Sequence, residues 1–256
     1  MTVRVSHSQD GAVLRLVLDR PKGNVLSMAL LGELRTALAA HRDDPHLKLV
    51  LVSGAGGNFS YGASVEEHRR VEAPAMLATF HAAIREVAAY PVPVAALVEG
   101  MCLGGAFELT LACHIVMATP RATFGCPEIK LGVFPPVLAA AGSVRLGGAL
   151  AESLLLTGST LSAEAAERAG FVTIVSDEEP ERAALDWFCA HLRPLSAFAI
   201  RQGTKAIRRA SGLLDALAAP LESAERQYVD EVLESHDGLE GIEAFLARRP
   251  PAWLDR

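Results

Sequence analysis

The chain has 256 residues, half of them hydrophobic, which allows a sizeable buried core and disfavours disorder. Its net charge is −6 and no basic stripe stands out, which argues against nucleic acid as the main partner. The apolar stretches are interrupted before they could span a bilayer, and the first ten residues lack the apolar core of a signal peptide. We therefore expect a cytoplasmic protein that binds neither nucleic acid nor membrane.

Hydrophobic periodicity predicts alternating strands and helices over the first half of the chain. The clearest helix covers 28–41, where leucines recur at helical spacing and Ser27 is placed to cap the first turn. A buried β-rich run covers 47–53 and ends in a glycine-rich turn. The same patterns predict further strands over 3–5, 12–19, 92–98, 115–118 and 122–124, and helices over 74–89 and 104–112.

The character of the sequence changes after Glu128. Strand signals nearly vanish except over 171–175, and helical patterns follow one another to the end. Strand-strand-helix units that give way to helices indicate an α/β spiral core with a helical C-terminal cap. We place the core at 1–195 and the helical region at 196–256.

The helical region carries many apolar positions between 197 and 236. Because one short contact cannot cover them all, we expect part of this surface to be buried between subunits. The positions are Leu213, Leu214, Leu217, Leu221, Val229 and Leu233.

Cysteine and histidine residues do not predict a metal site. The four cysteines form no CxxC pair, and Cys113-His114 has no further ligands at metal spacing. Free buried thiols are the simpler interpretation. His68 and His81 look like residues on the surface of helices.

Two turns that contain glycine follow buried strands, at 59–64 and 100–108. Where a strand becomes a helix, free backbone N–H groups converge and the helix dipole favours negative charge. Two such turns side by side can donate two hydrogen bonds to one carbonyl oxygen, as in an oxyanion hole. The alternative is that the glycines only permit tight turns and close packing.

Two glutamates stand near these turns in apolar sequence. Glu108 lies early in an apolar helix, and Glu128 follows Phe124-Gly125-Cys126-Pro127. A buried carboxylate tends to have a raised pKa, and two that meet in a pocket suit general acid/base catalysis. Equally, Glu108 can stabilise a helix N-terminus, and Glu128 can cap a helix or pair with an arginine such as Arg145.

At these residues the chain resembles the crotonase (enoyl-CoA hydratase/isomerase) superfamily, essentially from end to end. The motifs that carry the resemblance are Arg20-Pro21 to Leu26, Phe59-Ser60-Tyr61-Gly62-Ala63, Leu103-Gly104-Gly105-Ala106-Phe107-Glu108, Phe124-Gly125-Cys126-Pro127-Glu128, Leu156-Thr157-Gly158, Ala165 to Gly170 and Glu240 to Trp253. The resemblance implies a crotonase-like α/β spiral that assembles as a homotrimer or a dimer of trimers.

The resemblance also implies a site. Backbone amides of Ala63 and Gly105 would bind the thioester oxygen of an acyl-CoA, while Glu108 acts as base on a water and Glu128 protonates the α-carbon. No metal is implied, and no cofactor apart from the coenzyme A of the substrate. The residues expected to contact the substrate are Asn24, Tyr61, Gly62, Ser64, Gly104, Phe134 and Pro136.

Several positions depart from the family pattern. Ser64 stands where many relatives have Asp, Cys126 where hydratases often have Gln, and Phe134-Pro135-Pro136 replaces a glycine-rich stretch beside the acyl pocket. The motifs 59–68, 102–105 and 128–134 are most similar to cyclohexa-1,5-diene-1-carbonyl-CoA hydratases. The alternatives are a general enoyl-CoA hydratase or isomerase and, in another class, a non-catalytic binding scaffold. No GxSxG elbow supports a serine hydrolase.

Overall fold

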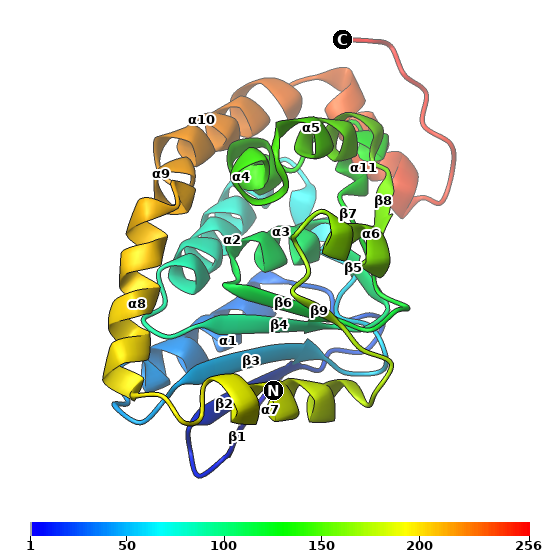
Figure 1. Cartoon of the computed structure of the whole chain (residues 1–256). Coiled ribbons are helices and arrows are strands. Elements are labelled where there is room, and N and C mark those ends of the chain that lie inside the picture. The colour runs from blue at the N-terminus through cyan, green and yellow to red at the C-terminus, as the bar shows by residue number, and fades with distance from the viewer. Residues whose placement is uncertain (1) are drawn as a thin grey trace.

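A computed structural model describes residues 2–256, and Figure 1 shows its arrangement. Its elements are β1 (Val3–Ser8), β2 (Val13–Leu18), α1 (Met28–His41), β3 (Leu49–Gly54), the 3₁₀ helix η1 (Glu66–His68), α2 (Ala73–Ala88), β4 (Val94–Val98), β5 (Met101–Leu103), α3 (Gly105–Ala112), β6 (Ile115–Ala118), β7 (Thr123–Gly125), the 3₁₀ helix η2 (Pro127–Leu131), α4 (Pro136–Leu146), α5 (Gly148–Thr157), β8 (Thr160–Ser162), α6 (Ala163–Arg168), β9 (Ile174–Val175), α7 (Pro180–His191), α8 (Ala197–Ala210), α9 (Leu213–Ala216), α10 (Ala219–Gln227), the π-helix η3 (Tyr228–Val232) and α11 (His236–Leu246).

A six-stranded sheet forms the base of the fold, in the order β1-β2-β3-β4-β6-β9. β1 pairs antiparallel with β2, and every later neighbour pairs parallel. Both faces are covered, which explains why β3 and β4 are continuous apolar runs. Helix α7 packs its Phe188 against one face, while α1, α2 and α3 cover the other (Figure 1).

A second, three-stranded sheet carries the turns that matter for the site. β5 pairs parallel with β7, and β7 pairs antiparallel with β8. The loop at 59–64 joins this sheet through a parallel bridge between Ser60 and Cys102. Three chain segments therefore run side by side and end at one place.

The structure confirms the predicted crotonase-like α/β architecture with a helical C-terminal region. Helix α1 covers the predicted 28–41, and Ser27 Oγ accepts the N–H of Leu30 at 3.3 Å. Strand β8 was not predicted, because three residues carry too little pattern. The strand expected at 171–175 is reduced to β9.

The C-terminal helices pack on the same core as the spiral. Leu213, Leu217, Leu221 and Leu233 are buried within the chain, and only Leu214 and Val229 are partly exposed. The expectation that part of this surface lies between subunits stays a prediction for Leu214 and Val229, and the other four positions do not contribute to it. Their apolar surface covers neighbouring helices, chiefly α4, instead. The division at residue 195 falls in the loop between α7 and α8 and remains a prediction.

His81 is also not a surface residue. Its side chain is fully buried, and its Nδ1 lies 2.6 Å from Oε2 of Glu225 on α10. The helical pattern counted histidine as polar and could not show a partner 144 residues away.

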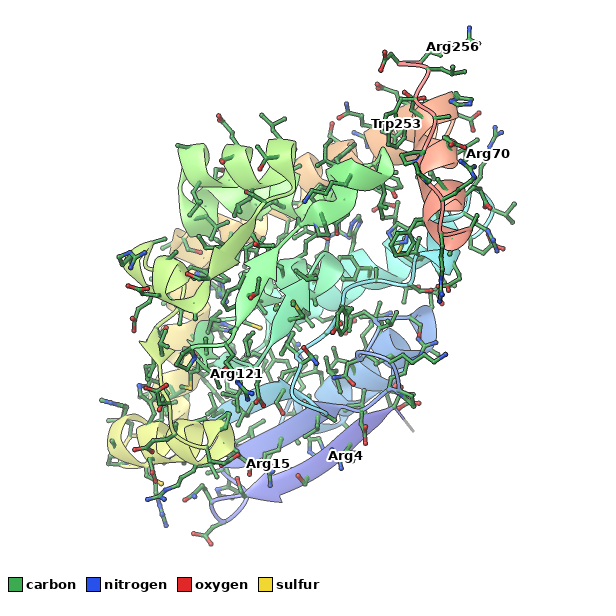
Figure 2. All side chains as sticks on the ribbon, turned by 90° about the vertical axis from the view of Figure 1, so that its right-hand side faces the viewer. Arg4, Arg15, Arg70, Arg121, Trp253 and Arg256 are labelled. Atoms are coloured by element: carbon green, nitrogen blue, oxygen red, sulfur yellow. The ribbon has the colours of Figure 1, made fainter. Side chains whose placement is uncertain are left out.

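The chain after α11 folds back along that helix, as Figure 2 shows for Trp253. Backbone N–H groups of Leu254 and Asp255 both donate to the carboxylate of Asp237 at 2.8 Å. A side-chain carbon at Gly132, just after η2, would lie 3.1 Å from the Trp253 ring. The terminal segment thus packs against the end of η2.

Several large apolar side chains are exposed on the surface of the single chain. Phe198 and Ile207 on α8 are 72% and 62% exposed, and Leu156 on α5 is 68% exposed. Isolated chains gain by covering such side chains. We expect multi-angle light scattering at micromolar concentration to give three or six times the chain mass of 27.1 kDa. A stable species of a single chain mass would contradict this prediction.

Candidate active site

The register of the second sheet brings the two predicted turns together. Ser60, Cys102 and Phe124 lie in one row across the paired segments. Three residues beyond Ser60 is Ala63, three beyond Cys102 is Gly105, and four beyond Phe124 is Glu128. Since paired segments advance together, all three reach the same end of the sheet.

Ala63 and Gly105 lie side by side at this end of the sheet. A side-chain carbon placed on Gly105 would lie 3.4 Å from Cβ of Ala63. Within residues 2–256, neither N–H donates to a protein group, whereas the N–H groups of the adjacent Ser64 and Gly104 both do. Gly105 is also the first residue of α3, where the helix dipole is positive. In the described part of the chain, both N–H groups are thus left without a protein acceptor at a helix N-terminus, an environment that favours negative charge.

Glu108 is buried in α3, with 3% of its surface exposed. Its Oε1 accepts N–H groups of Val137 at 2.7 Å and Leu138 at 3.0 Å, in the first turn of α4. These bonds favour the ionised form, but removal from water outweighs them and raises the pKa of Glu108. The alternative interpretation is thus partly right, because Glu108 does stabilise a helix N-terminus, that of α4.

Glu128 lies at the start of η2, beside Gly104. A side-chain carbon at residue 104 would be 2.5 Å from Glu128 Oε1, and Gly104 has φ +54, so glycine fits both constraints. Burial raises the pKa of Glu128, and the charge of Glu108 raises it further. The suggested partner Arg145 instead donates to the carbonyl of Cys113.

Both carboxylates reach a small inner cavity of about 20 Å³. Glu128 is partly exposed as a residue, yet its Oε2 is buried and has no hydrogen-bond partner within residues 2–256. Phe134 and Pro136, both predicted to border the acyl pocket, line this cavity together with Pro135. Pro136 begins α4, where its missing N–H costs no hydrogen bond.

An outer pocket of about 430 Å³ leads to Glu128. Its wall includes three residues predicted to contact substrate: Tyr61, Gly62 and Gly104. Ile242 and Phe245 of α11 form the opposite side. The pocket is mostly apolar, as an acyl chain requires.

Sequence reasoning missed two residues of the site, His68 and Tyr228. His68 lines both cavities, and its Nδ1 lies 2.7 Å from the carbonyl of Ser64. Burial lowers the pKa of His68, so its ring is neutral near pH 7. The interpretation of His68 as a residue on a helix surface is thus wrong. Its position in the sequence, five residues after Ala63, could have indicated a place in the site. Ser64 itself donates to Glu66 Oε2 at 2.8 Å and does not line either cavity.

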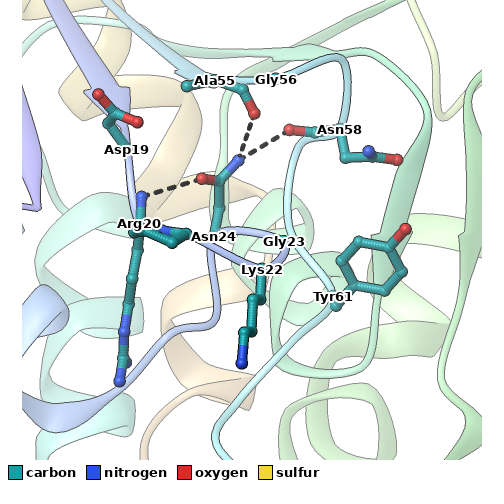
Figure 3. A pocket seen from close by; sticks show the side chains of 10 residues that line it. Asp19, Arg20, Lys22, Gly23, Asn24, Ala55, Gly56, Asn58 and Tyr61 are labelled. Carbon is teal, nitrogen blue, oxygen red and sulfur yellow. Dashed lines mark hydrogen bonds between the residues drawn. The ribbon is translucent and has the colours of Figure 1, made fainter.

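A third cavity, of about 540 Å³, shares Tyr61 with the outer pocket; Figure 3 shows the residues that line it. Arg20, Lys22 and Asn24 contribute to its lining. The Asn24 side chain is 2% exposed and is occupied by backbone groups: Oδ1 accepts from Arg20, and Nδ2 donates to Ala55 and Asn58. Asn24 therefore holds the loop in shape. Arg20, whose Nη1 donates to the carbonyl of Val25 at 3.2 Å, and the exposed Lys22 supply the positive charge of the lining.

No cluster of three or more histidine, cysteine or acidic side chains suits a metal ion in residues 2–256. The four cysteines are free, and Cys189 alone is not fully buried. None of the helices in the described part of the chain is long and apolar enough to cross a membrane.

A strand-strand-helix spiral with two free turn amides beside paired carboxylates defines a crotonase-type protein. The chain belongs to the enoyl-CoA hydratase/isomerase family, whose model matches residues 8–256. The sequence predicted an enzyme of the lyase class, of the enoyl-CoA hydratase type, and this prediction is confirmed.

Individual relatives agree with this membership. A cyclohexa-1,5-dienecarbonyl-CoA hydratase of Thauera aromatica is 39% identical over 254 residues, or 99% of this chain and 97% of the relative. This confirms the predicted similarity to that subfamily. A carnitinyl-CoA dehydratase of Salmonella arizonae is 32% identical, with 96% of each chain covered. The crystal structure of an enoyl-CoA hydratase from Mycobacterium avium subsp. paratuberculosis K-10 has a TM-score of 0.85 and 30% identity, covering 100% of this chain and 99% of the other.

The raised pKa of Glu128 predicts a pH-dependent effect on stability. Since the folded protein holds this proton more tightly than the unfolded chain, the stabilisation is complete below the ordinary pKa of 4.5 and is lost as pH rises through the folded value. Glu128→Gln mimics the neutral acid and avoids this loss. We expect its melting temperature to exceed that of wild type at pH 8, by roughly 2–4 °C per kcal/mol of relieved burial cost, and to approach wild type near pH 5.

Thermal unfolding of both proteins from pH 5 to pH 8 checks this expectation. Glu152→Gln, on the exposed surface of α5, is the matched control. A stability advantage of Glu128→Gln that shrinks as pH rises would show that Glu128 is ionised in a favourable environment.

Proposed function

We propose that the protein is a hydratase that adds water to the double bond of an α,β-unsaturated acyl-CoA thioester. One observation carries the proposal: two buried carboxylates with raised pKa line a single small cavity beside two free backbone amides. Hydration needs a base, an acid and a site for negative charge, and this place offers all three.

The thioester oxygen lies between the N–H groups of Ala63 and Gly105. Glu108 is the base, since two amides favour its ionised form, and Glu128 is the acid, since burial and then the neighbouring charge keep it protonated. Glu108 takes a proton from water as the oxygen bonds to the β-carbon. The electron pair of the double bond forms a new bond between the α-carbon and the thioester carbon, while the carbonyl π pair moves onto the oxygen. When the carbonyl re-forms, the α-carbon takes the proton of Glu128.

Coenzyme A fits the outer cavities. Tyr61 lines both the acyl pocket and the 540 Å³ cavity, so a ligand can pass from one to the other around its ring. Arg20 and Lys22 supply positive charge for phosphate groups at the far end. The other groups expected to contact substrate are Gly62 and Gly104 in the acyl pocket and Phe134 and Pro136 at its inner end.

The acyl group that we favour is compact and cyclic. Proline fixes φ, so Pro135-Pro136 and the Phe134 ring form a rigid inner wall that does not yield to a long chain. The Thauera relative is named for a cyclic dienoyl thioester, which supports cyclohexa-1,5-diene-1-carbonyl-CoA as substrate. No cofactor besides the substrate's coenzyme A enters this mechanism, and we retain the trimer or dimer of trimers as its assembly.

Glu108→Gln and Glu128→Gln test the division of roles. Each keeps the shape but removes a proton transfer, so each should lower kcat by roughly 10²–10⁴-fold. Because both groups act on one water, the double variant should be little worse than the poorer single variant. Steady-state kinetics provide the measurement, and acyl-CoA affinity, which depends on the two amides, is the control.

The result also separates hydration from its rivals. A one-glutamate isomerase would lose activity with one substitution and keep it almost intact with the other. A binding scaffold would show no turnover in the wild type. Near-native kcat in both single variants would end the hydratase proposal.

A substrate panel tests the shape of the acyl pocket. We expect kcat/KM to be higher for the cyclic dienoyl thioester and for crotonyl-CoA than for long straight enoyl thioesters, because the inner wall is rigid. The hydrated products are identified by mass spectrometry. Values of kcat/KM that rise steadily with linear chain length would contradict this.

A further inference from the structure

Tyr228 lines the inner cavity but has no part in the reaction above. It begins the π-helix η3, a form often found at functional sites, and its side chain is 1% exposed. The ring packs edge-on against Phe134, with 5.7 Å between ring centroids. A segment 100 residues beyond Glu128 therefore meets both carboxylates in one cavity.

The hydroxyl of Tyr228 is buried without a hydrogen-bond partner among residues 2–256. Burying such a group unpaired is unfavourable, so its presence calls for a partner that is not protein. His68 does not serve, because its Nδ1 bonds to the carbonyl of Ser64 and neither of its ring nitrogens reaches the Tyr228 hydroxyl. Glu128 Oε2 is unpaired in the same cavity.

One oxygen atom placed between these groups satisfies both of them. The cavity of about 20 Å³ exceeds the roughly 10–15 Å³ that a single water needs. A water there has two hydrogens and two lone pairs. Glu108 and the carbonyl oxygen of the protonated Glu128 accept the hydrogens, and one lone pair attacks the β-carbon, which leaves the second lone pair for a donor.

We propose that the Tyr228 hydroxyl is this donor, a third ligand of the reacting oxygen alongside Glu108 and Glu128. The inference rests on the hydratase function proposed above. Tyr228 holds the water before attack and the new hydroxyl group of the product after it. Burial and the two nearby carboxylates raise the pKa of Tyr228, so it keeps its proton and remains a donor near pH 7.

Tyr228→Phe removes the hydroxyl and keeps the ring. The lost bond is made to a reacting oxygen, so kcat should fall roughly 10–100-fold while KM changes little. Tyr90→Phe is the matched control: Tyr90 is equally buried, but its hydroxyl donates to the carbonyl of Leu38 at 2.9 Å. The control should keep native kcat and lose about 2–4 °C in melting temperature, whereas Tyr228→Phe should lose none.

A binding measurement isolates the oxygen itself. In the slow Glu108→Gln background, 3-hydroxybutyryl-CoA carries the oxygen and butyryl-CoA lacks it. Adding Tyr228→Phe should weaken binding of the hydroxylated thioester roughly 10-fold and leave butyryl-CoA binding unchanged, as measured by isothermal titration calorimetry. Equal weakening of both thioesters would overturn the inference, because the ring would then matter only for shape.

Other outcomes also decide it. Native kcat in Tyr228→Phe, with a wild type that hydrates enoyl thioesters, overturns the role of Tyr228 and leaves the proposed function intact. A Tyr228→Phe protein that fails to fold overturns it as well, since the hydroxyl would then serve the fold. Absence of turnover in the wild type over the whole panel instead removes the proposed function on which the inference rests.

Discussion

Parallel pairing of three short backbone segments is the constraint on which the site depends. Ser60 pairs with Cys102, and Cys102 pairs with Phe124. All three segments therefore leave the second sheet at the same end. Three or four residues further along each segment lie the amides of Ala63 and Gly105 and the carboxylate of Glu128. A slip of one residue would reverse the face of every group, because side chains alternate along a strand. The six-stranded sheet and its helices hold this small ladder in place.

The second theme is the burial of charge. Glu108 is compensated by the first turn of α4, which supplies two N–H groups and the positive end of a helix. Glu128 lacks such compensation and meets the charge of its neighbour instead. This asymmetry gives two chemically identical side chains different surroundings, and the proposed division into a base and an acid rests on it. Helix α4 begins at Pro136, so the next two N–H groups, of Val137 and Leu138, are the ones that donate to Glu108.

Much of this was predictable from local sequence. The α1 helix, its Ser27 cap and the order of strands follow from periodicity and capping, and the turns at Ala63 and Gly105 were marked by small residues after apolar runs. The misjudged residues depend on distant partners. His81 is buried and bonds to Glu225. Leu213 and Leu217 are buried because they pack on the core that the earlier helices form. Tyr228, which the sequence did not indicate, packs against Phe134. Local patterns carry no information about which remote segment supplies the contact.

The return of the C-terminal segment has a consequence for biosynthesis. Glu108 and Glu128 leave the ribosome long before Tyr228, the α11 side of the acyl pocket and the Trp253 contact at η2. At about 5–20 residues per second, the nascent chain carries its carboxylates for roughly 5–20 s before Tyr228 follows. During that interval the apolar floor of the pocket is uncovered and the chain is open to chaperones and proteases. Catalytic competence therefore arrives late in translation, together with the segment that shields the pocket.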